Sequence, residues 1–185
     1  STAEYNYVRK TFGNCLPHPK TLGKRYQSID GRPGYTAKSL RAIKIKVKEM
    51  KTSNKTLLCN MVRDEMSVRQ HVMWTGKRLV SYVNYGFNME GNDSLLEARN
   101  ALVFMLVALN SRWKIPVAYF FINGLSGEER ANLVMGCFDM LQDTGVVISS
   151  ITFDGAACNL AMANSLGASL TCDNLKPYFP RPVTN

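Results

Sequence analysis

Two aspartates stand where a metal-dependent reaction on phosphate esters would need them. Asp64 follows the apolar run 57–62, and Asp154 follows the β-branched run 146–153, so each is expected at the carboxyl end of a buried strand. Ligands of open α/β sheets gather at these ends, and carboxylate oxygens suit a hard cation such as Mg²⁺. Two ions about 3.5–4 Å apart would stabilise both the attacking and the leaving oxygen.

The same aspartates also have a simpler interpretation. An aspartate after a strand often caps the next helix or turn, and Asp154 is followed by Gly155, a common turn pair. Gly155 would equally allow the backbone or a phosphate to approach Asp154 closely. Glu65 is expected on the opposite side of its strand from Asp64, at the surface or supporting the site. The residue pattern leaves the capping and metal-binding interpretations open.

Positive charge is concentrated near the N-terminus. The 185-residue chain has a formal net charge of +9, and residues 1–55 carry 13 lysines and arginines against three acidic residues. Residues 56–185 carry 10 against 11. This asymmetry favours a polyanionic partner, with nucleic acid as the first candidate, although a solvated helix face explains the charge equally well. The candidate nucleic-acid contacts are Arg41, Lys44, Lys46 and Lys48.

Other classes of site find little support in the sequence. The five cysteines lack CxxC spacing and mostly lie in apolar surroundings, which predicts buried, reduced thiols of an intracellular protein. A structural zinc site is not expected with two histidines, and His71 is interpreted as structural. No glycine-rich phosphate cradle occurs. The apolar run 101–109 is too short to cross a membrane, and the N-terminus does not resemble a secretory signal.

The elements that must position the aspartates alternate between strands and helices. Residues 36–50 have helical spacing, although 43–47 also alternates as a strand does, and 101–109 is interpreted as either a buried strand or a buried helix. Capping boxes at Ser94 and Ser126 predict helices. The remaining expectations are strands over 57–62, 115–122 and 146–153, a hairpin of 71–74 with 79–85, a glycine stop at Gly145, and a helix over 156–166. This order predicts an α/β domain with a mixed sheet.

A series of motifs covering nearly the whole chain, from residue 7 to 182, resembles the P element-type DNA transposases, which include the THAP-domain-containing transposases of animals. The motifs are Leu16-Pro-His-Pro19, Asp64-Glu-Met-Ser-Val-Arg69, Trp113-Lys-Ile-Pro-Val-Ala-Tyr-Phe120, Thr152-Phe-Asp-Gly155, Asn159, Leu166-Gly167 and Pro177-Tyr-Phe-Pro180. The resemblance implies an RNase H-like catalytic domain that holds Mg²⁺, or Mn²⁺ as a substitute, with an Asp–Asp–Glu set. Asp64 matches the first catalytic aspartate of the family and Asp154 the second.

The resemblance also implies where this chain departs from the family. Residues 1–55 correspond to a basic, mainly helical N-terminal segment, and residues 56–185 to the first part of an incomplete RNase H-like mixed sheet flanked by helices. The zinc-binding THAP module has no counterpart here. The GTP-binding insertion, the third carboxylate, and the last strand and helix lie in the family beyond the Pro177–Pro180 motif. GTP is therefore expected only through a region absent from this chain.

Two functions of different classes remain as expectations. The first is the catalytic-domain portion of a nuclear cut-and-paste DNA transposase, with DNA as its partner, either as transposon ends or without sequence preference, and without activity in the isolated chain. The second is a domesticated, transposase-derived module that acts by protein or nucleic-acid binding. Its incomplete sheet would leave an open strand edge for another protein or a second copy. No membrane partner is expected.

Overall fold

The computed structural model describes residues 2–27, 31–74, 79–86 and 96–180. The chain divides into two compact units, residues 1–32 and 33–185. The first unit contains two helices, α1 (Thr2–Thr11) and α2 (Pro19–Gln27). The turn between them is held by Arg9, whose guanidinium donates to the carbonyl of Leu16 over 3.0 Å and to the side chain of Asn14 over 2.8 Å. The expected helical character of this segment is therefore seen in residues 2–27.

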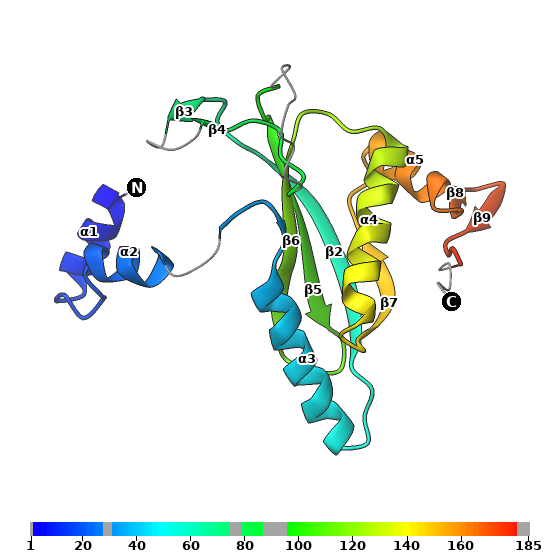
Figure 1. The fold of residues 1–185 in the computed structure, drawn as a ribbon, viewed down its shortest axis with the longest axis horizontal. Helices are drawn as coiled ribbons and strands as arrows, with labels where there is room; N and C mark the ends of the chain where they lie inside the picture. The colour runs from blue at the N-terminus through cyan, green and yellow to red at the C-terminus, as the bar shows by residue number, and fades with distance from the viewer. Residues whose placement is uncertain (1, 28–30, 75–78, 87–95, 181–185) are drawn as a thin grey trace. The chain divides into compact units, whose positions relative to one another are not determined.

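A five-stranded mixed sheet forms the centre of the second unit (Figure 1). Its strands, in spatial order, are β1 (Gly34–Tyr35), β6 (Lys114–Ile122), β5 (Asn100–Ala108), β2 (Leu58–Ser67) and β7 (Val147–Thr152). β2 pairs antiparallel with β5 and parallel with β7. The mixed α/β sheet predicted from the sequence is confirmed.

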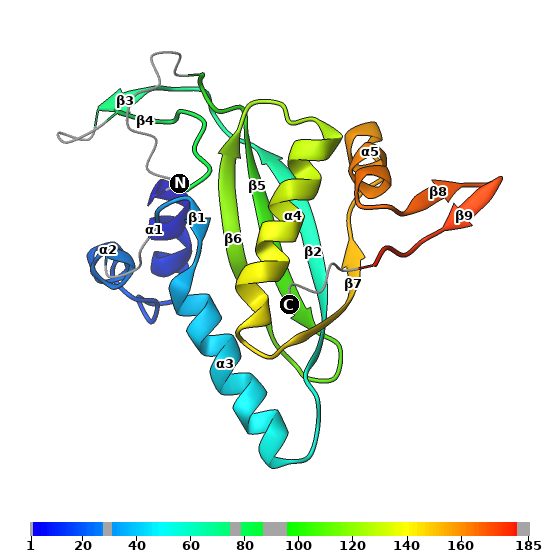
Figure 2. The same ribbon diagram turned by 45° about the vertical axis from the view of Figure 1, so that its right-hand side comes forward.

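Two long helices, α3 (Ala37–Thr52) and α4 (Gly127–Gln142), lie on one face of this sheet, which we call the helix face (Figures 1 and 2). Both helices contribute to one hydrophobic core with alternate residues of β2, β5 and β6. The buried members include Ile43 and Val47 of α3, Val134 and Leu141 of α4, and Met61, Leu102, Phe104 and Phe120 of the sheet. We call the opposite face the open face, because its side chains, such as Val62 and Met105, remain partly exposed.

Most of the predicted elements are present. The run 101–109 is a strand rather than a helix, since β5 is hydrogen-bonded on both sides, to β2 and to β6. The alternation at 43–47 belongs to helix α3. The capping box at Ser126 is complete, with Ser126 Oγ accepting from the Glu129 N–H over 3.2 Å and the Glu129 carboxylate accepting from the Ser126 N–H over 2.8 Å. Gly145 adopts a φ of +75° after α4, as expected of a residue that ends a helix.

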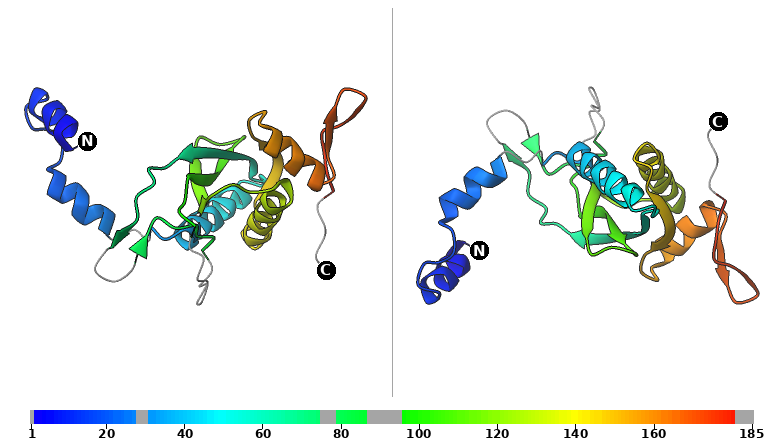
Figure 3. Two further views of the ribbon diagram at one scale, coloured as in Figure 1. Left: turned by 90° about the horizontal axis from the view of Figure 1, so that it is seen from above. Right: turned by 90° about the horizontal axis from the view of Figure 1, so that it is seen from below.

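The remaining elements lie outside the main sheet. Helix α5 (Ala157–Ser165) packs against α4 near the end of β7, as Figure 3 shows from above and below. The predicted hairpin is formed by the short strands β3 (Met73–Trp74) and β4 (Leu79–Val80). A second hairpin, β8 (Ser169–Thr171) with β9 (Asn174–Lys176), was not predicted.

Several expectations need correction. β2 continues to Ser67, so Asp64 lies inside the strand rather than after it, because residues 63–67, mostly polar, still pair with β5. The capping box at Ser94 begins outside the described residues, and Glu97 forms an isolated bridge with Tyr82 instead of a helical turn. The domain boundary expected after residue 55 falls within the second unit, since α3 is part of its core.

The cysteines also differ in part from the expectation. All five are free, but only Cys59 and Cys137 are buried, whereas Cys158 is half-buried and Cys15 and Cys172 are exposed. The exposed pair lies in loops and turns, where the apolar neighbours in sequence do not enclose the thiol. In the described part of the chain, no helix has the length and apolar character needed to span a membrane.

Candidate active site

The parallel pairing of β2 with β7 brings the two candidate aspartates to the same end of the sheet. The register matches Asn60 with Ser150 and Val62 with Thr152. Asp64 lies two residues after Val62, and Asp154 lies two residues after Thr152. Asn60 and Thr152 share a side-chain hydrogen bond of 2.9 Å, which places these alternate positions on one face. By the alternation of β2, Asp64 also lies on this open face.

Each aspartate is exposed and has one carboxylate oxygen engaged by its surroundings. Asp64 Oδ1 accepts from the backbone N–H of Glu65 over 2.8 Å. Asp154 lies two residues beyond β7, where its Oδ1 accepts from the Ala156 N–H over 3.3 Å and from the side-chain amide of Asn159. Within the described residues, Oδ2 of either aspartate accepts no hydrogen bond. Asp154 thus accepts a hydrogen bond from the backbone just before α5, and its Oδ2 accepts none from the described residues.

Behind Asp64, on the helix face of β2, lies a buried charge cluster that the sequence did not reveal. Arg63 is 2% exposed, and its guanidinium donates to Glu65 Oε1 over 3.0 Å and to the side-chain oxygen of Asn159. Arg130 of α4 donates to the same Glu65 oxygen. Asn100 of β5 donates to the other Glu65 oxygen over 3.1 Å. We call Arg63, Glu65, Arg130 and Asn159 the arginine cluster.

The charge balance of the arginine cluster links it to both aspartates. Burial, and then the charge of Arg130, lower the pKa of Arg63 to about 10, while Asp154 and Asp64 act in the opposite direction, as Cys158 does. The negative charges of both aspartates therefore favour the charged form of Arg63. Arg63 Nε has no hydrogen-bond partner within the described residues. The expectation that Glu65 points away from Asp64 agrees with the structure, although Glu65 is an ion-pair partner rather than a plain surface residue.

The donor set at this end of the sheet suits a divalent cation with oxygen ligands. Asp64 and Asp154 offer free carboxylate oxygens from adjacent parallel strands, and Mg²⁺ favours such ligands together with several waters. Glu65 is held on the other face by two arginines. Among the residues that the structure describes, no group of three or more histidine, cysteine and acidic side chains is gathered for a metal. The described residues therefore fit two ligands of a magnesium site.

The four predicted nucleic-acid contacts divide into two groups on α3. Arg41, Lys44 and Lys48 are exposed and lie three and four residues apart, so they are neighbours along one exposed stripe of α3. Lys46 lies apart from them and forms an ion pair of 2.7 Å with Glu49. The structure brings three of the four cations together.

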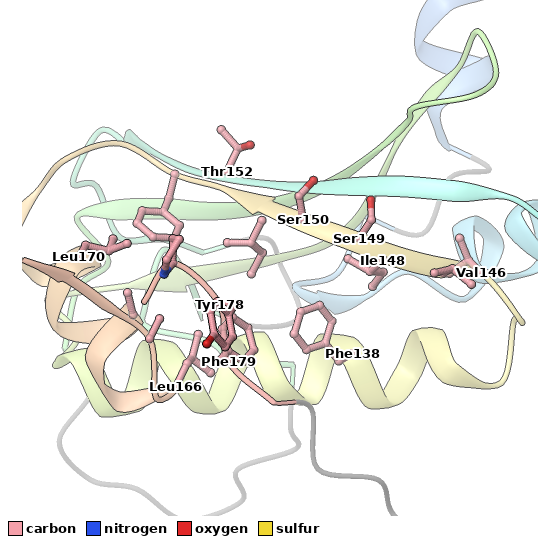
Figure 4. Close-up of a pocket in the computed structure, with 16 residues that line it drawn as sticks. Phe138, Val146, Ile148, Ser149, Ser150, Thr152, Leu166, Leu170, Tyr178 and Phe179 are labelled. Carbon is pink, nitrogen blue, oxygen red and sulfur yellow. The ribbon is translucent and has the colours of Figure 1, made fainter. Parts of the chain in front are cut away.

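The outer edge of β7 borders an apolar pocket of about 630 Å³ (Figure 4). β7 is the last strand of the five-stranded sheet, so its outer edge pairs with none of the described strands. Phe138 of α4 and Phe179 stack across the pocket with ring centroids 6.2 Å apart, and Tyr178 lies beside them. None of the lining residues is charged.

Comparison with known proteins gives three matches. Residues 31–167 match a protein family described as TNP-like, RNase H N-terminal domain. The human protein DNA transposase THAP9 is 26% identical over 187 residues, a match that covers the whole of this chain and 20% of the relative. The solved structure titled Drosophila P element transposase strand transfer complex superimposes with a TM-score of 0.59 and 18% identity, covering 95% of this chain and 37% of that chain. The chain thus spans about a fifth of the length of its curated relative.

Proposed function

Because the chain belongs to the family of TNP-like RNase H N-terminal domains, we propose that it provides the first two metal-binding carboxylates of a DNA transposase. The observation that carries the proposal is the placement of Asp64 and Asp154 at the same end of two adjacent parallel strands, each with a free oxygen. The family resemblance of both motifs and the transposase relatives support it. A third carboxylate comes from outside this chain, and the intact protein acts on DNA in the nucleus.

Each residue has a defined part in this proposal. Bound magnesium ions would supply Lewis-acid stabilisation of the attacking and leaving oxygens of a DNA phosphate. Asp64 holds its carboxylate on β2, which pairs with β5 at this position and with β7 up to Val62, and Asp154 holds its carboxylate just before α5. The exposed cations Arg41, Lys44 and Lys48 attract the phosphate backbone without reading sequence. GTP has no proposed role in the described residues.

The metal site is tested by Mn²⁺ titration of the chain, followed by paramagnetic broadening of backbone NMR signals. Two carboxylates form an incomplete site, so we expect weak binding, on the order of millimolar, centred on Asp64 and Asp154. The double variant Asp64→Asn/Asp154→Asn should lose this broadening. The matched control Asp139→Asn, which changes an exposed aspartate of α4, should retain it.

Two outcomes contradict the proposal. Identical broadening in the double variant would mean that Asp64 and Asp154 are only turn and cap residues. DNA cleavage by the isolated chain, where none is expected, would mean that another acidic residue completes the site.

The second candidate function is a binding module, favoured by the outer edge of β7 and its uncharged pocket. An unpaired strand edge beside apolar side chains is suited to pairing with another strand. A second copy of this chain, offering its own β7, would satisfy both edges at once. Val147 is 44% exposed and lines the pocket.

Sedimentation velocity over a concentration series tests this alternative. A dimer that dissociates in Val147→Lys, but persists in the control Leu175→Lys on β9, supports the binding module. A monomer at every concentration contradicts pairing between copies.

A further inference from the structure

We propose that Asn159 is a positioning residue that connects the buried Arg63 to Asp154 and fixes the orientation of the Asp154 carboxylate. The inference rests on the proposed function of Asp154 as a metal ligand. It concerns a contact between residues that are 96 positions apart in sequence, Arg63 in β2 and Asn159 in α5.

The amide of Asn159 joins a donor on one side to an acceptor on the other. Its side-chain oxygen accepts from Arg63 Nη1, and its nitrogen donates to Asp154 Oδ1 and, over 3.5 Å, to the Asp154 carbonyl. A guanidinium can only donate and an ionised carboxylate can only accept. The two neighbours therefore permit one orientation of the amide, and a flipped amide would meet a donor with a donor and an acceptor with an acceptor.

The buried charges explain why Arg63 turns toward Asn159. Glu65 is the carboxylate that both Arg63 and Arg130 contact, so one negative charge faces two buried cations. A buried cation needs further hydrogen bonds to offset its lost hydration. Asn159 is 6% exposed, so its amide oxygen offers Arg63 such a bond without competition from bulk water.

This arrangement restrains Asp154 from one side. Oδ1 is held by Asn159 and by the N–H of Ala156, so rotation of the carboxylate would break both hydrogen bonds. Oδ2 stays available for a cation. Hydrogen bonds behind a metal ligand commonly set its orientation, and their removal typically weakens metal binding by 10-fold to 100-fold. Because the described residues offer two ligands, we expect the lower end of this range.

The first experiment compares Mn²⁺ affinity, measured by electron paramagnetic resonance, in the wild-type chain, Asn159→Ala and the control Asn60→Ala. Asn60 is an asparagine on β2 that bonds to Ser150 and Thr152 and not to Asp154. We expect affinity to fall about 10-fold in Asn159→Ala and to stay unchanged in the control. Urea unfolding of each variant, measured in parallel, identifies any loss that comes from unfolding.

A double-mutant cycle tests whether Arg63 acts through Asn159. Arg63→Met leaves Glu65 and Arg130 as a balanced ion pair, so it removes the excess positive charge of the cluster and leaves no buried charge without a partner. We expect Arg63→Met to weaken Mn²⁺ binding, and the double variant Arg63→Met/Asn159→Ala to be no weaker than Asn159→Ala alone. Additive losses would overturn the proposed connection.

A measurement that does not require Arg63→Met or Asn159→Ala to fold uses the side-chain amide signals of Asn159 in an NMR spectrum. We expect one amide proton to lie downfield in the wild-type chain and to move upfield in Asp154→Ala, where its acceptor is removed. Unchanged amide signals would overturn the inference. A different result would contradict the proposed function itself: Mn²⁺ binding that does not change in Asp64→Asn/Asp154→Asn. Loss of binding in that variant with full affinity in Asn159→Ala overturns the positioning role alone.

Discussion

Arg63 and Glu65 lie two residues apart on the helix face of β2, with Arg63 Nη2 donating to Glu65 Oε1 over 3.0 Å. The same carboxylate oxygen accepts from Arg130, so Glu65 ties β2 to α4. Asp64, between Arg63 and Glu65, lies on the other face. β2 therefore presents a candidate metal ligand, Asp64, on the open face. The residues on either side of Asp64 form the ion pairs that connect β2 to α4 on the helix face.

Replacing Glu65 should destabilise the fold strongly. Glu65→Gln leaves the buried guanidiniums of Arg63 and Arg130 without a counter-charge, and breaking a buried pair in this way costs about 3–5 kcal/mol. Glu65 is 22% exposed, so we expect a loss of about 3 kcal/mol in the free energy of unfolding, measured with urea. The control Glu49→Gln removes an exposed pair with Lys46 and should cost at most about 0.5 kcal/mol. Equal losses in the two variants would contradict a structural role for the cluster.

The hydroxyl of Tyr35 requires glycine at position 136 of α4. A Cβ atom at this position would overlap the Tyr35 hydroxyl, while the ring carbon Cζ would be at an ordinary 3.6 Å. The Tyr35 ring is held edge-on against Phe120 with centroids 5.5 Å apart. We expect Gly136→Ala to cost about 1–3 kcal/mol in the wild-type background.

The same substitution should stabilise the chain once the hydroxyl is removed. In a Tyr35→Phe background, the added Cβ of Gly136→Ala no longer meets a hydroxyl, so the substitution gains the helix propensity of alanine, about 1 kcal/mol. Thermal unfolding of the wild type, Gly136→Ala, Tyr35→Phe and the double variant measures this reversal of sign. A Gly136→Ala effect that is the same in both backgrounds would show that the hydroxyl is not the obstacle.

The buried thiols predict a loss of stability at alkaline pH. Burial raises the pKa of Cys59 to about 11 and that of Cys137 to about 12, from an ordinary value of 9.0. Above about pH 9 the unfolded chain releases these protons while the folded chain keeps them, so ionisation favours unfolding. The free energy of unfolding should therefore fall between pH 9 and pH 11.

Urea unfolding across this pH range measures the effect. A Cys59→Ala/Cys137→Ala variant should show a smaller decline, whereas Cys15→Ser/Cys172→Ser, which alters the exposed thiols, should match the wild-type slope. A wild-type stability that is constant from pH 9 to pH 11 would disagree with burial of Cys59 and Cys137.

The basic side of α3 predicts salt-sensitive DNA binding. Charge reversal of Arg41, Lys44 and Lys48 should weaken binding to duplexes of any sequence and lower the salt dependence by about one unit of slope per lost phosphate contact. Lys46→Glu should have a smaller effect, because Lys46 is already paired with Glu49. Fluorescence anisotropy at several salt concentrations measures both. If Lys46→Glu and Lys44→Glu weakened DNA binding equally, or if DNA affinity did not change with salt, these lysines would be a solvated surface and not a DNA contact.

Local sequence determined most of the secondary structure. Ser126 and Glu129 complete a capping box with atoms three residues apart, and the apolar run 115–122 predicts the strand β6. The two aspartates could be placed near strand ends for the same reason, because turn residues and apolar runs are short-range signals. The extension of β2 through polar residues to Ser67 could not be predicted, since pairing with β5 overrides their modest strand preference.

Only the tertiary structure decided which side chains meet. Parallel pairing brings Asp64 to the same end of the sheet as Asp154. Packing of α4 brings Arg130 to Glu65 across 65 residues of chain, and packing of α5 brings Asn159 to Arg63 across 96. No local pattern marks Arg63 as buried, because an arginine is ordinarily exposed and becomes tolerable inside only when distant partners replace its water. The sequence by itself could identify the two carboxylates that offer oxygens to a cation. The hydrogen bonds that hold one of them in place depend on contacts that exist only once the sheet and helices have assembled.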